Sequence, residues 1–230
     1  MPNLVLGTIF DYKFTNFYKF TYKDLYISSK FAIFAAKMKK NKHMTKTLYI
    51  IAGCNGAGKT TASLTILPEI WECKEFVNAD EIARGLSPLN PEGVAIQAGR
   101  IMLQRIDELI QEGISFSIET TLSTRSYINL VKRAQQEGYI VNLLFFWLPT
   151  PNVAIQRVAK RVKEGGHNIP EDVIVRRYNL GLNNFFYLYK DAVDFWTLVN
   201  NASNPRQIIA TKDEILDVQL YKKIEDYVKC

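Results

Sequence analysis

The feature that most constrains this chain is a glycine-rich run between an apolar segment and a helical one. Residues 53–60 read GCNGAGKT, which matches the pattern GxxxxGK followed by Ser or Thr. The apolar residues Leu48–Ala52 precede the run and predict a buried strand, and Thr61–Leu67 predict a helix. Such a run binds phosphate when strand, loop and helix follow one another in this order. We therefore expect a phosphate-binding loop here and not a chance glycine turn.

This loop predicts a site for ATP and magnesium. Its glycines let successive backbone N–H groups point at the β- and γ-phosphates, and the N-terminus of the following helix adds positive potential. Lys59 supplies a cation, and the Thr60 hydroxyl supplies a ligand for Mg²⁺. No base is evident beside Cys54, so we expect a small packing residue and not a catalytic thiol. The predicted nucleotide-binding residues are Gly53, Asn55, Gly56, Ala57, Gly58, Lys59, Thr60 and Thr61.

Short apolar runs alternate with longer segments of helical period along the rest of the chain. This order predicts a parallel sheet covered on both faces. The predicted strands are Leu48–Ala52, Phe76–Ala79, Ser115–Glu119, Ile140–Leu148 and Gln207–Thr211. The predicted helices include Val94–Glu112, Ser126–Glu137 and Asn152–Lys163. The 230 residues fit one α/β domain, a three-layer P-loop NTPase sandwich with a mainly parallel sheet of about five strands and a helical lid.

Residues 1–43 differ in composition from the rest of the chain. They contain eight Lys, two Asp and ten aromatic residues, and they account for the whole net charge of +6. Two interpretations stay open. The segment could be translated upstream sequence, with Met44 as the true start, or a basic aromatic arm that lies on a membrane surface, on nucleic acid or over the active site.

Cysteine usage and charge bear on compartment and partners. Three cysteines without a CxxC pair argue against a disulfide framework or a zinc site, and favour a reducing cytoplasm. The chain has no run of eighteen or more apolar residues, so we expect no membrane span. Residues 44–230 carry 21 basic and 21 acidic residues, which makes long nucleic acids an unexpected partner for this part. We expect a small-molecule substrate.

Two carboxylates follow predicted strands, at the edge of the sheet where such folds bind ligands. Asp80 follows the second strand and could deprotonate an attacking hydroxyl or hold Mg²⁺ through water. Its alternative role is the N-cap of the next helix. Glu119 ends the third strand and could meet a magnesium-bound water or a substrate hydroxyl. Its alternative role is an ion pair with Arg84 or Arg125.

Four arginines flank a predicted hinge. Arg157 and Arg161 lie four residues apart, on one face of a predicted helix. The run GGH at 165–167 breaks that helix, and the pair Arg176 and Arg177 opens the next one. Arginines around a glycine hinge suit a lid that adds positive charge when it closes over phosphates. The alternative is a solvated basic helix whose side chains pair with neighbouring acidic residues.

Together these motifs resemble the zeta toxin family of P-loop kinases, especially its compact members. The motifs are GCNGAGKTT at 53–61, VNADEIARGLSP at 77–88, ETTLS at 119–123, RVAKRVKEGGHNIP at 157–170 and RRY at 176–178. The resemblance implies that residues 44–230 form a P-loop kinase domain, which transfers the γ-phosphate of ATP to a hydroxyl group of a small molecule. The best-known members phosphorylate the sugar of UDP-N-acetylglucosamine. A toxin of this kind also implies an inhibiting antitoxin protein as a partner.

The resemblance assigns roles by position. Asp80 would be the general base and Glu119 would contact the substrate sugar, while Lys59 would serve ATP. The lid arginines match less closely, because larger family members space them differently. The catalytic candidates are Asp80, Lys59, Arg157 and Arg161, and the substrate-binding candidates are Arg84, Glu119, Thr121, Arg176 and Arg177.

Functions of other classes stay open as alternatives. A nucleotide or polynucleotide kinase would use the same loop. A P-loop ATPase without a phosphate acceptor usually has a run of four apolar residues followed by Asp, and transporter ATPases also have an LSGGQ-like signature. The chain contains neither motif. A nucleic-acid or membrane-binding protein would depend on residues 1–43.

Overall fold

The structure is a computed structural model, which describes residues 46–69, 73–166, 168–203 and 206–229. The segment 1–43 and the alternative start at Met44 lie outside these residues, as does His167. Within the part of the chain that is described, no helix combines the length and the apolar character that a membrane span needs.

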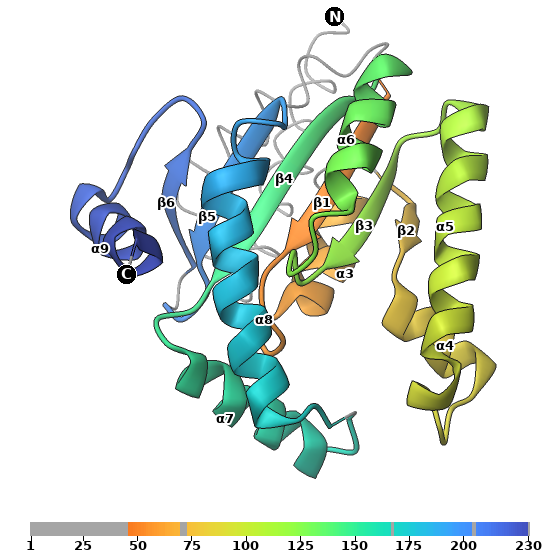
Figure 1. Ribbon diagram of the computed structural model, residues 1–230, viewed down its shortest axis with the longest axis horizontal. Helices are drawn as coiled ribbons and strands as arrows, with labels where there is room; N and C mark the ends of the chain where they lie inside the picture. The colour runs from red at the N-terminus through yellow and green to blue at the C-terminus, as the bar shows by residue number, and fades with distance from the viewer. Residues whose placement is uncertain (1–45, 70–72, 167, 204–205, 230) are drawn as a thin grey trace, which may run out of the picture.

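Six strands form one sheet in the centre of the fold (Figure 1). Their bounds are β1 Thr47–Ala52, β2 Glu75–Val77, β3 Phe116–Thr120, β4 Ile140–Trp147, β5 Phe195–Asn200 and β6 Gln207–Thr211. The strand order is β2-β3-β1-β4-β5-β6, with parallel pairing from β2 to β5 and antiparallel pairing of β6. β1 lies between β3 and β4 and is buried along its whole length, as its apolar sequence predicts for the centre of a parallel sheet.

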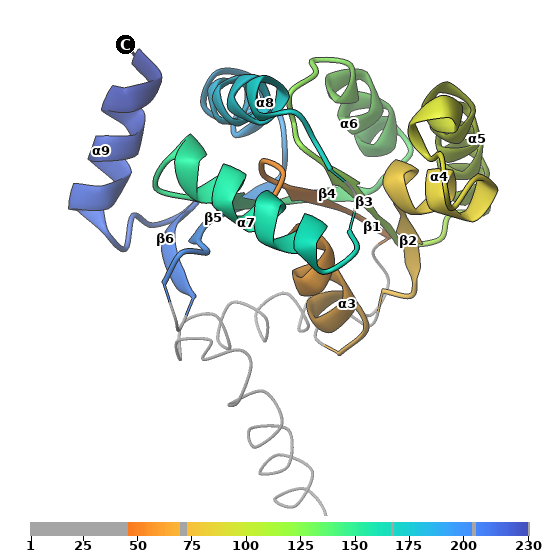
Figure 2. The ribbon, with the colours of Figure 1, turned by 90° about the horizontal axis from the view of Figure 1, so that it is seen from below.

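Helices cover the two faces of the sheet unequally. Their bounds are α3 Lys59–Glu69, α4 Ala79–Leu86, α5 Ala95–Glu112, α6 Tyr127–Gln136, α7 Pro151–Lys163, α8 Glu171–Asn184 and α9 Val218–Lys229. α3 lies on one face, and α4, α5, α6 and α8 lie on the other (Figure 2). Right-handed crossovers explain this division, because the chain runs one way along the sheet from β1 to β2 and the opposite way in the later connections.

Two elements matter most for the site. α7 lies across the carboxyl ends of the strands (Figure 1), directly beside the P-loop. α8 is fixed to the body by side-chain hydrogen bonds to backbone oxygens: Tyr178 Oη donates to Leu148 and Asn184 Nδ2 donates to Leu122, both at 2.8 Å. Both donors are buried, so α8 is held in a defined position over the sheet.

The predicted three-layer α/β fold with a mainly parallel sheet is confirmed, and the sheet has one more strand than predicted. The missed strand is β5. A π-helical turn, η2 (Phe185–Tyr189), ends only five residues before it, and the sequence between them contains no Gly or Pro. The pattern therefore gives no sign that a helical segment has ended. The second strand is also shorter than predicted, because β2 ends at Val77.

Candidate active site

The phosphate-binding loop joins β1 to α3 and has a conformation that requires glycine. Gly53, Gly56 and Gly58 have φ angles of +140°, +78° and +78°, which residues with a Cβ atom rarely adopt. A Cβ atom on Gly56 would lie 2.7 Å from the backbone oxygen of Ala154 in α7. Glycine at this position therefore allows the loop and α7 to approach one another.

Lys59 and Thr60 begin α3 and meet the same carboxylate. Lys59 Nζ lies 3.6 Å from Glu119 Oε1, and Thr60 Oγ1 lies 2.9 Å and 3.1 Å from the two Glu119 oxygens. Burial raises the pKa of Glu119, while the charge of Lys59 and the hydroxyl of Thr60 oppose this shift. The alternative ion pair of Glu119 with Arg84 or Arg125 is wrong, because Lys59 is its partner.

Asp80 approaches the same site from α4. The N-cap of this helix is Asn78, whose Oδ1 accepts a hydrogen bond from the backbone N–H of Asp80 at 2.9 Å. The alternative role of Asp80 as the cap is therefore wrong, and its carboxylate stays exposed in the first turn. Burial is the main cause that raises the pKa of Glu119, and the negative charge of Asp80 raises this pKa further. The two carboxylates thus lie within electrostatic reach of each other.

Arginines from three helices line a cavity of about 380 Å³ beside Asp80. They are Arg84 from α4, Arg161 from α7, and Arg176 and Arg177 from α8. Burial and the charge of Arg84 lower the pKa of Arg161, which indicates that these cations lie near one another. We call this hollow the arginine cavity. Its excess of positive charge suits an anionic group.

Arg157 lies elsewhere, although it shares α7 with Arg161. Its Nη2 donates to the backbone oxygen of Asn201 at 2.9 Å, and Arg157 does not line the arginine cavity. The side chain of Asn201 in turn donates to the backbone oxygen of Ala57 in the P-loop. Of the four candidate lid arginines, Arg157 therefore lies beside the P-loop, whereas Arg161 lines the arginine cavity.

The remaining predicted residues fall into two groups. Arg177 connects α8 to the P-loop, because its Nη1 donates to Asn55 Oδ1 at 3.1 Å. Thr121 does not line the arginine cavity, and its hydroxyl lies 2.8 Å from that of Ser123. Thr61 is exposed on α3. Arg177 thus contacts the P-loop directly, whereas the hydroxyl of Thr121 pairs with that of Ser123.

Cys54 is a packing residue in this geometry. Its side chain is buried, and burial raises the pKa of the thiol to about 11. The thiol therefore stays protonated at neutral pH, and a protonated thiol is a poor nucleophile.

Two residues of the site escaped the sequence analysis. Asn78 contacts Glu119 and caps α4 at Asp80, and Asn201 supports the P-loop from the end of β5. An Asn just before a helical segment is a common N-cap, so Asn78 had a readable signal. Asn201 had none, because the strand that positions it was itself missed.

The oxygen donors of Thr60 at the start of α3 and of Glu119 in β3 fit Mg²⁺. The Thr60 hydroxyl and the Glu119 carboxylate lie side by side, and both are the hard oxygen donors that Mg²⁺ prefers. Among the described residues, no group of three or more His, Cys, Asp or Glu side chains could hold a metal by itself. This donor set suits an ion that takes its other ligands from water and from the phosphates of a nucleotide.

The chain is similar to known proteins. The family model described as Zeta toxin matches residues 32–193, more than half of the chain. An uncharacterized protein of Haemophilus influenzae is 33% identical over 126 residues, which cover 55% of this chain and 88% of that protein.

Two solved structures share the fold. One belongs to the PezAT chromosomal toxin–antitoxin system of Streptococcus pneumoniae, with a TM-score of 0.60 and 17% identity over 89% of this chain and 95% of that one. The other is the complex AvrRxo1-ORF1:-ORF2 with ATP, with a TM-score of 0.65 and 18% identity over 83% of this chain and 66% of that one. The family match, with the P-loop and the arginine cavity in place, leads to one conclusion: the chain belongs to the Zeta toxin family.

Proposed function

We propose that this protein is a magnesium-dependent kinase that transfers the γ-phosphoryl group of ATP to a hydroxyl of an anionic small molecule. The observation that carries the proposal is the meeting of two half-sites. The P-loop with Lys59, Thr60 and Glu119 forms one half, and the arginine cavity with Asp80 forms the other. A phosphate donor and a hydroxyl acceptor need such adjoining sites to react in line.

The P-loop half supports ATP as the donor. Backbone N–H groups of the loop and the N-terminus of α3 would hold the phosphates, and Lys59 would neutralise charge on the transferred group. Thr60 and Glu119 would hold Mg²⁺, which supplies charge stabilisation between the phosphates when bound. The ATP complex of the AvrRxo1 proteins lends support from a structure of the same fold.

Asp80 is the proposed general base. Its exposed carboxylate lines the arginine cavity, where an acceptor hydroxyl would lie. Asp80 accepts the proton as the hydroxyl oxygen attacks the γ-phosphorus, and the bond to the β–γ bridging oxygen breaks. The products are a phosphorylated acceptor and ADP.

The arginine cavity supports an acceptor that carries phosphate or another anion. Guanidinium groups bind phosphates in a planar, two-bonded geometry, and four of them line one hollow. A diphosphate-linked sugar such as UDP-N-acetylglucosamine satisfies this requirement and has free hydroxyls. A nucleotide acceptor would satisfy it as well, so the nucleotide kinase stays as the second candidate.

A partner protein belongs to the same proposal. The solved structures of the same fold come from a toxin–antitoxin system and from a two-protein complex, which supports an antitoxin-like inhibitor for this chain. We place the kinase in residues 44–230 and in the cytoplasm. Three cysteines without a CxxC pair support a reducing compartment.

Mass spectrometry tests this function. The purified protein is incubated with ATP, Mg²⁺ and a bacterial metabolite extract, and separately with UDP-N-acetylglucosamine alone. We expect one species in the extract to gain a single phosphate, and this gain to be strongly reduced when the Lys59→Ala variant is used. Release of phosphate to water, without any phosphorylated metabolite, would contradict the kinase and favour an ATPase.

A further inference from the structure

The side chain of Asn78 bonds the carboxylate of Glu119 at one end and the backbone of Asp80 at the other. Its Nδ2 donates to Glu119 Oε2 at 3.1 Å, and its Oδ1 accepts from the backbone N–H of Asp80 at 2.9 Å. Only 6% of Asn78 is exposed, so water does not compete strongly for these bonds. The residue stands where β2 passes into α4, and it therefore links three elements: β2, α4 and β3.

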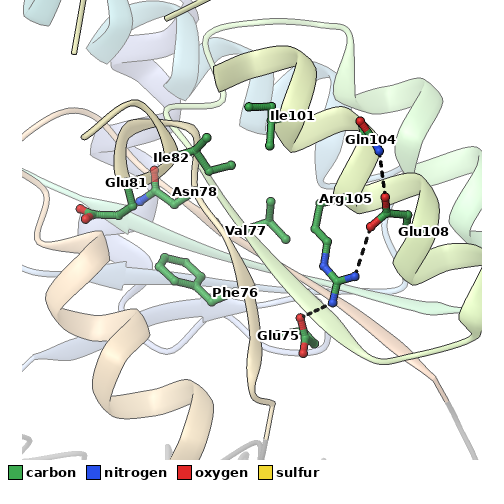
Figure 3. Close-up of a pocket in the computed structure, with 10 residues that line it drawn as sticks. All are labelled: Glu75, Phe76, Val77, Asn78, Glu81, Ile82, Ile101, Gln104, Arg105 and Glu108. Carbon is green, nitrogen blue, oxygen red and sulfur yellow. Dashed lines mark hydrogen bonds and ion pairs between the residues drawn. The ribbon is translucent and has the colours of Figure 1, made fainter. Parts of the chain in front are cut away.

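Asn78 also lines a hollow of about 500 Å³ between β2, α4 and α5 (Figure 3). Three charged groups of this hollow, Glu75, Arg105 and Glu108, pair with one another within its wall. Arg105 bonds Glu75 at 2.9 Å and Glu108 at 3.3 Å, and Gln104 donates to Glu108 at 3.0 Å. Asn78 differs from them, because its bonds lead away from the hollow to Glu119 and Asp80.

We propose that Asn78 is a positioning residue that sets the placement of Asp80 relative to Glu119. This inference rests on the proposed kinase function. A primary amide suits the task because it donates at one end and accepts at the other without carrying charge. An acid at this position would repel Glu119, and a hydroxyl on a shorter side chain would not span both partners.

Variants of Asn78 separate its two bonds. Asn78→Ser and Asn78→Asp keep an oxygen that can cap α4, because Ser and Asp are preferred N-cap residues. Neither reproduces the amide donor to Glu119. Asn78→Ala removes both bonds. Asp217→Ala is the matched control: Asp217 Oδ1 accepts from the N–H of Leu220 at 2.9 Å at the start of α9, near the other edge of the sheet from β2 (Figure 1).

We expect kcat to fall roughly 10- to 100-fold in Asn78→Ser and Asn78→Asp, the loss typical of one hydrogen bond to a charged group. The melting temperature should change little in Asn78→Ser, whereas Asn78→Asp should lower it, because its buried carboxylate would repel Glu119. Hydrogen exchange of the Asp80 amide should stay slow in both and become faster in Asn78→Ala. In Asp217→Ala, kcat should equal that of the unaltered protein.

Two results would overturn the inference. An unaltered kcat in both Asn78→Ser and Asn78→Asp would reduce Asn78 to a helix cap. An equal loss of kcat in Asp217→Ala would mean that general destabilisation explains the effect. If the unaltered protein phosphorylates no acceptor, the proposed function fails. The positioning role of Asn78 is then tested by crystal structures of the variants, without any kinetic measurement. We expect the Glu119 carboxylate to leave Thr60 in Asn78→Ser, and an unmoved carboxylate would contradict the positioning role.

Discussion

The P-loop half of the site and the arginine cavity are built in opposite ways. The P-loop is one continuous run of the chain, and its shape follows from three glycines with positive φ angles. The arginine cavity is assembled from α4, α7 and α8, whose residues lie far apart in sequence. A site built from backbone in one run can be read from a motif, whereas a site built from side chains of several helices depends on how those helices pack.

Loss of Lys59 should have the largest effect, because the P-loop half depends on one cation against a triphosphate. In Lys59→Ala we expect phosphoryl transfer to fall by about 10²–10³-fold and the ATP-induced rise in melting temperature to be largely lost. A transfer assay measures the rate of phosphoryl transfer, and calorimetry with and without ATP measures the rise in melting temperature. Lys160→Ala, an exposed residue on α7, is the control. Equal ATP-induced shifts in Lys59→Ala and the unaltered protein would count against the P-loop assignment.

The two arginines of α7 provide a direct contrast between the halves. Arg161→Ala should raise the KM for the acceptor roughly 10- to 100-fold and leave ATP affinity unchanged, because Arg161 lines the arginine cavity. Arg157→Ala should instead weaken ATP binding, because Arg157 contacts Asn201 beside the P-loop. Steady-state kinetics with both substrates measure the two KM values, and Lys163→Ala serves as the control. If Arg157→Ala and Arg161→Ala changed the same KM value, the assignment of the two arginines to different halves of the site would be wrong.

Most of the fold was readable from the sequence, and the reasons are physical. The apolar run of β1 and the glycine loop after it constrain the chain locally, so the bounds of β1 were predicted to within one residue and the start of α3 to within two. β5 was missed because the aromatic segment before it gives no boundary signal. With β5 the position of Asn201 was lost as well. Local sequence signals thus predict single strands, loops and helices. They do not predict which residues from several elements meet in the folded protein.

The candidate site follows the same rule. Glu119 and Asp80 were predicted as site residues because each lies at or just beyond the carboxyl end of a strand of the parallel sheet. Which partner Glu119 takes was not readable, because Lys59 and Arg84 are both plausible cations until the packing of α3 and α4 is known. The separation of Arg157 from Arg161 was equally hidden, since helical spacing gives a shared face but not what that face meets.

The ionisation of Glu119 should have a smaller effect than these variants, and the effect should be on the free energy of unfolding. Burial raises its pKa in the folded state, so its protonated form is favoured there. The resulting stabilisation is present below the unfolded-state pKa of about 4.3 and is lost as pH rises through the folded-state pKa. In Glu119→Gln this loss is absent. We therefore expect the variant's free energy of unfolding to rise relative to that of the unaltered protein between about pH 4 and neutrality.

Urea unfolding of both proteins across this pH range measures the difference. Glu112→Gln, an exposed change on α5, is the control. A difference between Glu119→Gln and the unaltered protein that does not change with pH would contradict the prediction.

The smallest effect is expected from removal of residues 1–43. The fragment 44–230 should be soluble and fold cooperatively, because it contains β1 and every other described element. The fragment 32–230, which begins where the family match begins, is the natural comparison. Circular dichroism and thermal unfolding compare the two with the full chain. If only 32–230 folds, residues 32–43 belong to the kinase domain.

Asp80 gives the most direct test of the central claim that the two halves form one kinase site. In Asp80→Asn, the amide preserves the shape of the carboxylate and cannot take the acceptor proton. Single-turnover transfer from γ-labelled ATP to the acceptor should fall by about 10²–10⁴-fold, while the Kd for ATP with Mg²⁺ stays close to that of the unaltered protein. Transfer by Asp80→Asn at the unaltered rate would contradict the account, and Glu119 would become the next candidate for the base.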